Sequence, residues 1–283
     1  MKGLIGNAIT IGAETLTAAG VAAPRMEAGS LMAHMMQCDR AFLIAHSNDP
    51  LSDQQLSNYQ QLIQRRAARE PLQYITGHQE FFKLDFQVTP DVLIPRPETE
   101  LIVEAVLDLF PTNAQIHFAD VGTGSGCIAI SILHERQQTR ATAIDLSAAA
   151  LAVAKHNAER HQVIDRMRPL RSNLFADLDG GEVFDLIVSN PPYIPDEDIR
   201  ELSVEVQQEP RSALAGGADG LNVITEVLDS APLRLSRGGY LIFEFGINQD
   251  REIKRMVNTD LWELIEVRPD LQSIPRIIVL RKQ

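Results

Sequence analysis

The feature that most constrains how this chain can fold is the alternation of strand-like and helix-like segments from about residue 98 onward. Apolar runs typical of buried strands lie at 115–121, 140–146 and 183–190, and helix-like segments lie at 126–136 and 147–161. Parallel strands are covered by helices on both faces, so they appear in a sequence as nearly continuous apolar runs. The pattern predicts an α/β domain with a mainly parallel sheet, with further strands at 166–173, 239–245, 261–269 and 275–282 and a further helix at 221–235.

The N-terminal part of the chain has a different character. Residues 1–75 are helix-like, with Pro24 at a suitable first helical position and Ser52 at the start of a capping-box pattern. Residues 76–97 alternate apolar and polar positions between prolines, which predicts a β-hairpin. We therefore expect three parts in the 283-residue chain, namely a helical domain over 1–75, a hairpin linker over 76–97 and an α/β domain over 98–283.

Charge and cysteine content exclude several classes of protein. The formal net charge is −12, so the chain lacks the overall basic field with which proteins grip nucleic acid phosphates. Its two cysteines, Cys38 and Cys127, form no pattern with metal-ligand spacing, and we expect no metal site. Two roles are open for Cys127, a reactive thiol near a helix start or a small core residue.

The N-terminal segment faintly resembles a secretory signal peptide. Its apolar stretch, however, is interrupted by Asn7, Thr10 and Glu14. No apolar run in the sequence approaches the roughly 20 residues that span a membrane. We therefore expect a cytoplasmic protein that makes no contact with a membrane.

A glycine-rich loop, DVGTGSGC, joins the first predicted strand to its helix. The loop contains three glycines separated by single residues, Gly122, Gly124 and Gly126. Such glycines let a ligand lie against the backbone, and the first crossover of a doubly wound sheet is where nucleotide ligands bind. Asp145, at the end of the next strand, is placed to accept hydrogen bonds from ribose hydroxyls. Because a dinucleotide loop would need a glycine in place of Cys127, the loop resembles the S-adenosylmethionine loop of Rossmann-like methyltransferases instead.

Two further residues near this candidate cofactor site each have two open roles. Asp120 can steady the glycine loop or contact the amino group of the cofactor. Asn173 ends the third predicted strand, where methyltransferases often have an aspartate that binds the adenine amino group. Its side-chain oxygen can accept there without a charge. The alternative for Asn173 is a surface turn residue.

The sequence NPPY at 190–193 ends the strand predicted before it and faces the cofactor crevice. Two adjacent prolines cannot lie inside a helix or a central strand, so they form a rigid corner. Methyl transfer to an amide or a base amine needs such a corner, because the lone pair of a planar nitrogen is delocalised. Asn190 can accept one N–H, the Pro191 carbonyl can accept the other, and Tyr193 can stack on the flat group. Both acceptors bind more strongly as positive charge grows on the nitrogen.

Four stretches resemble the release-factor glutamine methyltransferases of the HemK/PrmC type. They are REPLQYITGHQEFFKLDFQVTPDVLIPRPETELIVE (69–104), DVGTGSGCIAI (120–130), IVSNPPYIP (187–195) and EPRSALAGGADGLNVI (209–224). Many methyltransferases share the glycine and NPPY motifs, whereas TGHQEFF and LIPRPETE beside a helical N-terminal domain are more specific. The resemblance implies a Rossmann-like, seven-stranded, S-adenosylmethionine-dependent methyltransferase domain, preceded by a small helical bundle and a β-hairpin linker.

The same resemblance implies an activity and a partner. Members of the family methylate N5 of the glutamine in the Gly-Gly-Gln motif of peptide chain release factors, which act in translation termination, and they release S-adenosylhomocysteine. The cofactor would be held by Gly122, Thr123, Gly124, Ser125, Gly126, Asp145, Asn173, Leu174 and Asn190. The glutamine amide would be held by Asn190, Pro191, Pro192 and Tyr193, of which Asn190, Pro191 and Tyr193 are the catalytic candidates. We expect the helical domain to recognise the release factor, and we expect a monomer that makes no direct contact with nucleic acid.

Alternative functions can be compared by the sequence features that each of them needs. A glutamine methyltransferase that acts on a ribosomal protein shares the same motifs. An enzyme that methylates base amines should have a basic groove, which the acidic balance disfavours. A non-catalytic cofactor-binding adaptor has no need of NPPY, and a Rossmann dehydrogenase is disfavoured by Cys127. Within IPRPET (94–99), Arg96 either serves the cleft or pairs with an acid.

Overall fold

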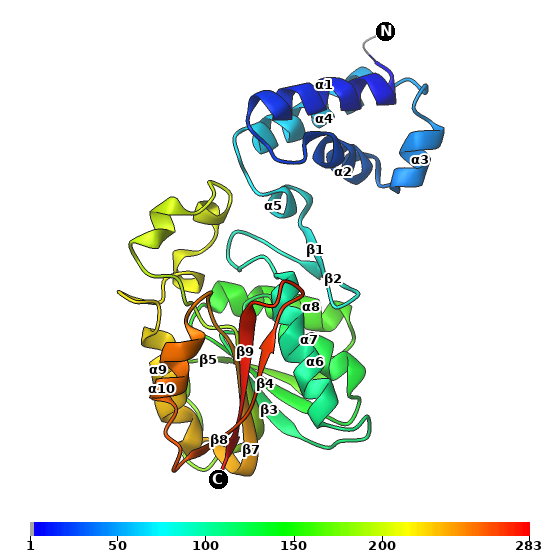
Figure 1. Ribbon diagram of the computed structural model, residues 1–283. Coiled ribbons are helices and arrows are strands. Elements are labelled where there is room, and N and C mark those ends of the chain that lie inside the picture. The colour runs from blue at the N-terminus through cyan, green and yellow to red at the C-terminus, as the bar shows by residue number, and fades with distance from the viewer. Residues whose placement is uncertain (1–2) are drawn as a thin grey trace. The chain divides into compact units, whose positions relative to one another are not determined.

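The computed structural model describes residues 3–283, which divide into two compact units (Figure 1). The helical unit extends to His78 and includes Ser203–Gln208, whereas the sheet unit contains Gln79–Leu202 and Glu209–Gln283. Each unit has its own hydrophobic core, as is usual for separate domains.

Within the described residues, the helical unit contains five α-helices, as the N-terminal periodicity predicts. Pro24 is the first residue of its helix, where its missing N–H costs no hydrogen bond. The predicted capping box is present, because the Gln55 N–H donates to Ser52 Oγ at 3.3 Å and the Ser52 N–H donates to Gln55 Oε1 at 3.0 Å. The helices are α1 (Ile5–Ala18), α2 (Pro24–Met36), α3 (Arg40–Ala45), α4 (Asp53–Ala67) and α5 (Leu72–Thr76).

Close packing of α1 against α4 depends on Gly12. A Cβ atom at this position would lie 2.5 Å from the Tyr59 hydroxyl oxygen and 2.9 Å from Ile63 Cδ1, so a larger residue would push the helices apart. The Tyr59 ring is buried, and its hydroxyl donates to the Ala28 carbonyl at 3.0 Å, which satisfies its one polar group. These contacts tie α1, α2 and α4 into one core.

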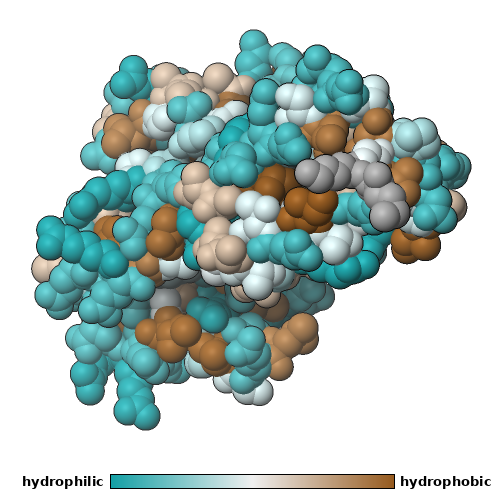
Figure 2. All heavy atoms as spheres, turned by 90° about the horizontal axis from the view of Figure 1, so that it is seen from above, coloured by the Kyte–Doolittle hydropathy of each residue, from teal (hydrophilic) through white to brown (hydrophobic). Residues whose placement is uncertain are grey.

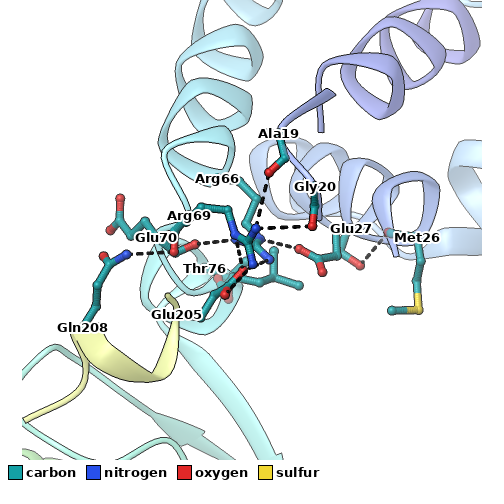
Figure 3. Close-up of polar contacts among 12 residues, drawn as sticks. Ala19, Gly20, Met26, Glu27, Arg66, Arg69, Glu70, Thr76, Glu205 and Gln208 are labelled. Atoms are coloured by element: carbon teal, nitrogen blue, oxygen red, sulfur yellow. Dashed lines mark hydrogen bonds and ion pairs between the residues drawn. The ribbon is translucent and has the colours of Figure 1, made fainter. Parts of the chain in front are cut away.

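A cluster of charged side chains lies on the helical unit (Figure 3). Arg66 is only 5% exposed, and it donates to Glu27 at 2.5 Å and to Glu205 at 2.9 Å. Arg69 donates to both oxygens of Glu205, at 2.7 and 2.8 Å. A buried guanidinium is tolerated only where carboxylates neutralise it and accept its hydrogen bonds. The cluster therefore explains why Ser203–Gln208 belongs to the helical unit.

The sheet unit is built on one seven-stranded sheet, counted over residues 3–283, with the order β5-β4-β3-β6-β7-β9-β8. All pairings from β5 to β7 are parallel, and β9 is antiparallel to β7 and to β8. The predicted mainly parallel sheet is therefore confirmed. The strands are β3 (His117–Val121), β4 (Arg140–Asp145), β5 (Met167–Arg171), β6 (Phe184–Ser189), β7 (Leu235–Glu244), β8 (Trp262–Pro269) and β9 (Pro275–Lys282).

Helices cover both faces of this sheet (Figure 1). One core contains apolar residues of α6, α7 and α8, and the other contains those of α9 and α10. The three predicted helices are confirmed as α7, α8 and α9, whereas α6 and α10 were not predicted. A proline-rich segment hides the start of α6, although its buried Ile102, Val103 and Val106 follow helical spacing. The helices are α6 (Glu100–Leu109), α7 (Cys127–Glu135), α8 (Ala148–Arg160), α9 (Asn222–Ser230) and α10 (Asp250–Met256).

The predicted hairpin is present as β1 (His78–Phe81) and β2 (Leu84–Gln87). Phe81 and Phe86 are buried in the core that contains α6 and α7. Asn157 of α8 holds β2 at its end, because its Oδ1 accepts from the Gln87 N–H at 2.8 Å and its Nδ2 donates to the Gln87 carbonyl at 3.0 Å. The hairpin is thus fixed to the sheet unit immediately before the proline-rich segment.

The apolar character of the N-terminal segment is used for packing. Helix α1 places Ile5, Ala8 and Leu16 in the core of the helical unit. No helix between residues 3 and 283 is long and apolar enough to cross a bilayer. Hydrophilic residues predominate on the face shown in Figure 2, where apolar residues form separate small groups.

Replacing Glu205 tests the charged cluster. Hydrogen bonds from Arg69 and Arg66 lower the pKa of the Glu205 carboxyl from 4.5 to about 2. Its stabilising contribution is therefore complete above pH 4.5 and is lost as the pH falls towards 2. We expect Glu205→Gln to lower the free energy of unfolding of the helical unit by roughly 2 kcal/mol at neutral pH. Urea unfolding followed by circular dichroism measures this difference, which should shrink across that pH range.

Glu70→Gln is the matched control for this experiment. It breaks a more exposed pair with Arg65, so its effect should stay below about 1 kcal/mol. Equal effects of the two variants, or a Glu205→Gln effect that is independent of pH, would contradict the role of the cluster.

Candidate active site

A cavity of about 280 Å³ lies in the sheet unit, at the carboxyl ends of β3, β4 and β6. Its volume is near the lower end of the range for small-ligand sites, roughly 300 to 1,000 Å³. Val121, Asp145 and Asn190 end or follow these three strands, and all of them line the cavity. Parallel pairing of the strands brings these residues together although they lie far apart in the sequence.

Most residues predicted for the site border this cavity. Those that line it are Gly122, Thr123, Gly124, Ser125, Asp145, Asn173, Leu174, Asn190 and Pro192. Gly126, Pro191 and Tyr193 are not among the lining residues. The glycine loop and the NPPY sequence therefore meet at one space, while the role of each residue there stays a prediction.

Hydrogen bonds to the backbone fix the shape of the glycine loop. The N–H groups of Gly122 and Thr123 both donate to the Ile144 carbonyl at 2.9 Å. Asp145 Oδ2 accepts from the Gly124 N–H at 2.9 Å, and its Oδ1 accepts from the Ser147 N–H at 2.8 Å. Each carboxylate oxygen has a second lone pair, so Asp145 can hold the loop and still accept from a ligand hydroxyl.

The glycine loop leaves open a space that side chains would fill. Gly122 and Gly124 have φ angles of +74° and +55°, and a Cβ on either would have no atom nearer than 3.9 Å. Asp145 supplies hydrogen-bond acceptors beside this space, and Leu146 and Leu174 supply apolar walls. Polar acceptors next to apolar walls suit the ribose and the flat base of a nucleoside, so the residues present fit such a cofactor.

Gly126 has a packing role in the structure. It is the N-cap residue before α7, with a φ of +81°, and a Cβ there would lie 2.8 Å from Ile130 Cδ1 and 3.2 Å from Ala154 Cβ. The glycine therefore allows α7 to lie close to α8. Its predicted contact with the cofactor stays a prediction.

Two buried groups near the loop had open roles, and the structure favours the structural role for each. Asp120 Oδ2 accepts from the Thr123 hydroxyl at 2.7 Å and from the Ala129 N–H at 3.2 Å, so Asp120 steadies the loop. Burial raises the pKa of Asp120 to about 7. Burial also raises the pKa of the Cys127 thiol to about 12, so this thiol is protonated and unreactive at neutral pH.

A chain of hydrogen bonds runs from the NPPY sequence into the sheet. Asn190 Nδ2 donates to Thr99 Oγ1 at 3.0 Å, and the Thr99 hydroxyl donates to Glu244 Oε2 at 2.6 Å. The Tyr193 hydroxyl donates to Glu244 Oε1 at 2.9 Å. Thr99 and Glu244 are each only 2% exposed, so water does not compete for these bonds. Tyr193 is thus anchored through its hydroxyl, and the stacking of its ring on a substrate stays a prediction.

A turn that contains glycines supports the NPPY sequence from behind. The Gly216 N–H donates to the Ile194 carbonyl at 2.8 Å. A Cβ on Gly216 would lie 2.8 Å from the Pro192 carbonyl oxygen, and a Cβ on Gly220 would lie 2.2 Å from the Tyr193 carbonyl oxygen. Only glycine lets the two backbones approach this closely.

Arg96 has an acidic partner at the cavity wall. Its Nη2 lies 2.5 Å from Glu209 Oε1, and the Ile94 N–H donates to Glu209 Oε2 at 3.0 Å. Glu209 is buried, whereas the Arg96 side chain is 31% exposed and lines the cavity. The two roles that the sequence left open for Arg96, in an ion pair and at the cleft, are therefore compatible.

Two family models match the chain, and named relatives match most of it. The PrmC N-terminal domain model matches residues 7–77, and the Methyltransferase small domain model matches residues 99–217. A protein of Koribacter versatilis named release factor glutamine methyltransferase is 39% identical over 94% of this chain and 94% of its own length. A protein of the same name from Geobacter sulfurreducens is 44% identical over 84% of this chain and 82% of its own length. This chain belongs to the release factor glutamine methyltransferase family.

A solved structure supports the same fold. A methyltransferase from Pyrococcus furiosus aligns with a TM-score of 0.52 at 17% identity, over 80% of this chain and 98% of its own. At this identity the likeness concerns the fold alone. The predicted fold class and family resemblance are confirmed for this member of the release factor glutamine methyltransferase family.

Sequence reasoning missed three polar residues that hold the segments around the cavity, although none of them lines it. They are Glu209, Glu244 and Gln249, whose Nε2 donates to the Tyr193 carbonyl at 3.0 Å. Glu244 had a signal that was overlooked, because it interrupts the apolar strand GYLIFEF and a charged residue in a buried strand is rare unless it is paired. Glu209 and Gln249 follow no periodic pattern that could have identified them.

Substitution of Gly220 tests the support behind the NPPY sequence. Gly220 has a φ of +77°, and an added Cβ collides with the Tyr193 carbonyl oxygen. We expect Gly220→Ala to lower the free energy of unfolding of the sheet unit by about 2 kcal/mol or more. Fluorescence of Trp262, the one tryptophan of the chain, reports urea unfolding of this unit. Gly180→Ala is the control, because its Cβ meets no atom within 4 Å; equal stability of the two variants would contradict the close contact.

Proposed function

We propose that this protein methylates N5 of the glutamine in the Gly-Gly-Gln motif of peptide chain release factors. Relatives with a corresponding name match nearly the whole chain. The observation that carries the proposal is the shared wall of the cavity, where Asn190 and the glycine loop lie side by side. The backbone carbonyl oxygen of Asn190 is 3.9 Å from the point where a Cβ on Gly122 would lie. A carboxamide held at the NPPY sequence therefore lies next to the cofactor.

The residues of the cavity divide between parts of the cofactor. When bound, S-adenosylmethionine is the methyl donor and supplies a methyl group attached to a positively charged sulfur. The backbone of Gly122–Gly126 receives its amino acid portion, and Asp145 accepts from its ribose hydroxyls. Asn173 and Leu174, which line the cavity, contact the adenine. Asn190 borders both the cofactor and the substrate.

Orientation of the substrate amide is the main task of the NPPY residues. Asn190 Oδ1 accepts one hydrogen of the glutamine amide, and the Pro191 carbonyl accepts the other. Pro191 and Pro192 restrict the backbone, so the two acceptors keep a fixed spacing. Positive charge grows on the amide nitrogen during transfer and is lost when one of its hydrogens leaves as a proton. Both acceptors bind the charged nitrogen more strongly than they bind the ground state. The ring of Tyr193 packs against the flat amide group.

The parts of the chain have distinct tasks in this proposal. The helical domain over 1–75 recognises the release factor, residues 76–97 form the linker, and residues 98–283 carry out catalysis. The match of the PrmC N-terminal domain model to residues 7–77 supports this division. We further propose a cytoplasmic monomer that binds the release factor without contacting nucleic acid directly, in keeping with the net charge of −12.

Substitution of Asn190 separates substrate binding from cofactor binding. We expect Asn190→Ala to abolish methyl transfer while the Kd for S-adenosylmethionine stays within about tenfold, roughly 1.4 kcal/mol. The variant loses the acceptor for the substrate amide but keeps the glycine loop and Asp145. Isothermal titration measures the Kd, and transfer of a labelled methyl group measures activity. Asn113→Ala, at an exposed position outside the cavity, should leave both unchanged. Parallel loss of activity and affinity in Asn190→Ala would refute the assignment.

A direct experiment identifies the substrate. Labelled S-adenosylmethionine is supplied with release factors, ribosomal proteins, DNA and RNA in parallel reactions. We expect label only in release factors, with mass mapping to the glutamine of Gly-Gly-Gln. Label in a ribosomal protein or in nucleic acid would overturn the proposed substrate.

A further inference from the structure

We propose that Thr99 and Glu244 are positioning residues that set the orientation of the Asn190 carboxamide, so that its oxygen is available to the substrate. This inference rests on the proposed function, because it concerns the amide that Asn190 binds. It assigns a task to two buried residues that need not touch the substrate themselves.

The direction of each hydrogen bond follows from the chemistry of Glu244. An ionised carboxylate can only accept, so both Thr99 and Tyr193 must donate their hydroxyl hydrogens to it. Thr99 has a single hydroxyl hydrogen, and this hydrogen is used on Glu244. The Thr99 oxygen can then only accept, and the atom of Asn190 that faces it must be the NH2 group.

These successive hydrogen bonds determine whether the oxygen or the nitrogen of the Asn190 side-chain amide faces Thr99. The oxygen and nitrogen of a side-chain amide are nearly the same in shape, so hydrogen-bond partners determine which position each takes. With Nδ2 held by Thr99, Oδ1 is turned away from Thr99, and among residues 3–283 no side chain or backbone group donates to it. Asn190 lines the cavity. Its oxygen is therefore the atom left to accept from a substrate N–H.

Protonation of Glu244 on Oε2, the oxygen that faces Thr99, reverses the chain of hydrogen bonds. A protonated carboxyl carries a hydrogen that it can donate to Thr99, and the Thr99 hydroxyl then turns its own hydrogen towards Asn190. Such a donor would pair with Asn190 Oδ1 and leave the NH2 group facing the substrate. Two NH2 groups cannot bond to each other, so the substrate amide would lose an acceptor that it needs in the transition state.

The surroundings of Glu244 raise the pKa of its carboxyl above the value of an ordinary glutamate. Burial raises the pKa of Glu244, and the hydroxyls of Thr99 and Tyr193 lower it in part. Among the charged groups near it, Glu98 raises the pKa and Arg276 lowers it. Because the pKa is raised, the protonated form persists to higher pH than for an ordinary glutamate, and kcat should rise with pH as the carboxylate forms.

Two substitutions at Thr99 separate the hydroxyl group from the shape of the side chain. Thr99→Val keeps the volume and removes the hydroxyl, whereas Thr99→Ser keeps the hydroxyl. We expect kcat of Thr99→Val to fall by about 10- to 100-fold, with the Kd for S-adenosylmethionine within about threefold of the parent value. Thr99→Ser should retain kcat within about threefold. Equal losses in the two variants, or a loss of cofactor affinity that matches the loss of kcat, would overturn the inference.

Glu244→Gln tests the reversed chain. Glutamine does not titrate, so the fall in kcat at low pH that Glu244 causes in the parent protein should disappear in this variant. A variant whose kcat still falls at low pH as in the parent protein would contradict the role of Glu244. Unfolding temperatures of all the variants are measured alongside, so that a folding defect is recognised.

A spectroscopic measurement decides the inference without any substrate. In protein labelled with 15N-asparagine, the side-chain NH2 signal of Asn190 is assigned by its loss in Asn190→Ala. We expect this signal to shift as Glu244 is titrated, and the shift to be absent in Glu244→Gln and in Thr99→Val. A signal that ignores pH, or that behaves alike in the parent protein and both variants, overturns the inference. If release factors are not methylated but the signal titrates as expected, the proposed function fails and the positioning chain stands.

Discussion

Parallel pairing of β3 with β4 on one side and β6 on the other is the constraint on which the site depends. Parallel strands present their carboxyl ends at one edge of a sheet, so the loops that follow them must converge. Gly122, Asp145 and Asn190 end or directly follow these strands and border one cavity for this reason. A shift of one residue in the register of a strand would turn its side chains to the opposite face. The backbone hydrogen bonds between the strands therefore determine which residues meet at the cavity.

Buried carboxylates then connect the loops to one another. A carboxylate has two oxygens, so that one residue can hold two segments of chain at once. Glu209 accepts from the Ile94 N–H and from Arg96, and Glu244 accepts from Thr99 and Tyr193. Removing such an acid leaves buried donors without partners, at a cost of about 1–3 kcal/mol for each. These acids make the site rigid. Substituting Glu209 or Glu244 therefore destabilises the site, although neither residue needs to touch the substrate.

The features that were predictable from the sequence are those that depend on local pattern. Buried parallel strands are apolar runs, and the glycine loop and NPPY are local solutions of backbone geometry, so all of these could be located before the structure was known. Contacts between loops were not predictable, because the pairings of Glu209 with Arg96 and of Glu244 with Thr99 depend on irregular segments that meet only in the fold. Helix α6 escaped prediction for a related reason, since prolines precede it and hide its start.

The parts of the NPPY corner come from widely separated places in the chain. Its support includes Thr99 before it in the sequence, and Gly216, Gly220 and Glu244 after it. Contacts between distant residues require closure of long loops, which costs conformational entropy. During synthesis, a nascent chain exposes Asn190 well before β7 with Glu244 has left the ribosome, and β9 follows later still. The support of the NPPY corner is therefore complete only after Glu244 has been synthesised, so that a shorter translation product carries the motif without the contacts that hold it.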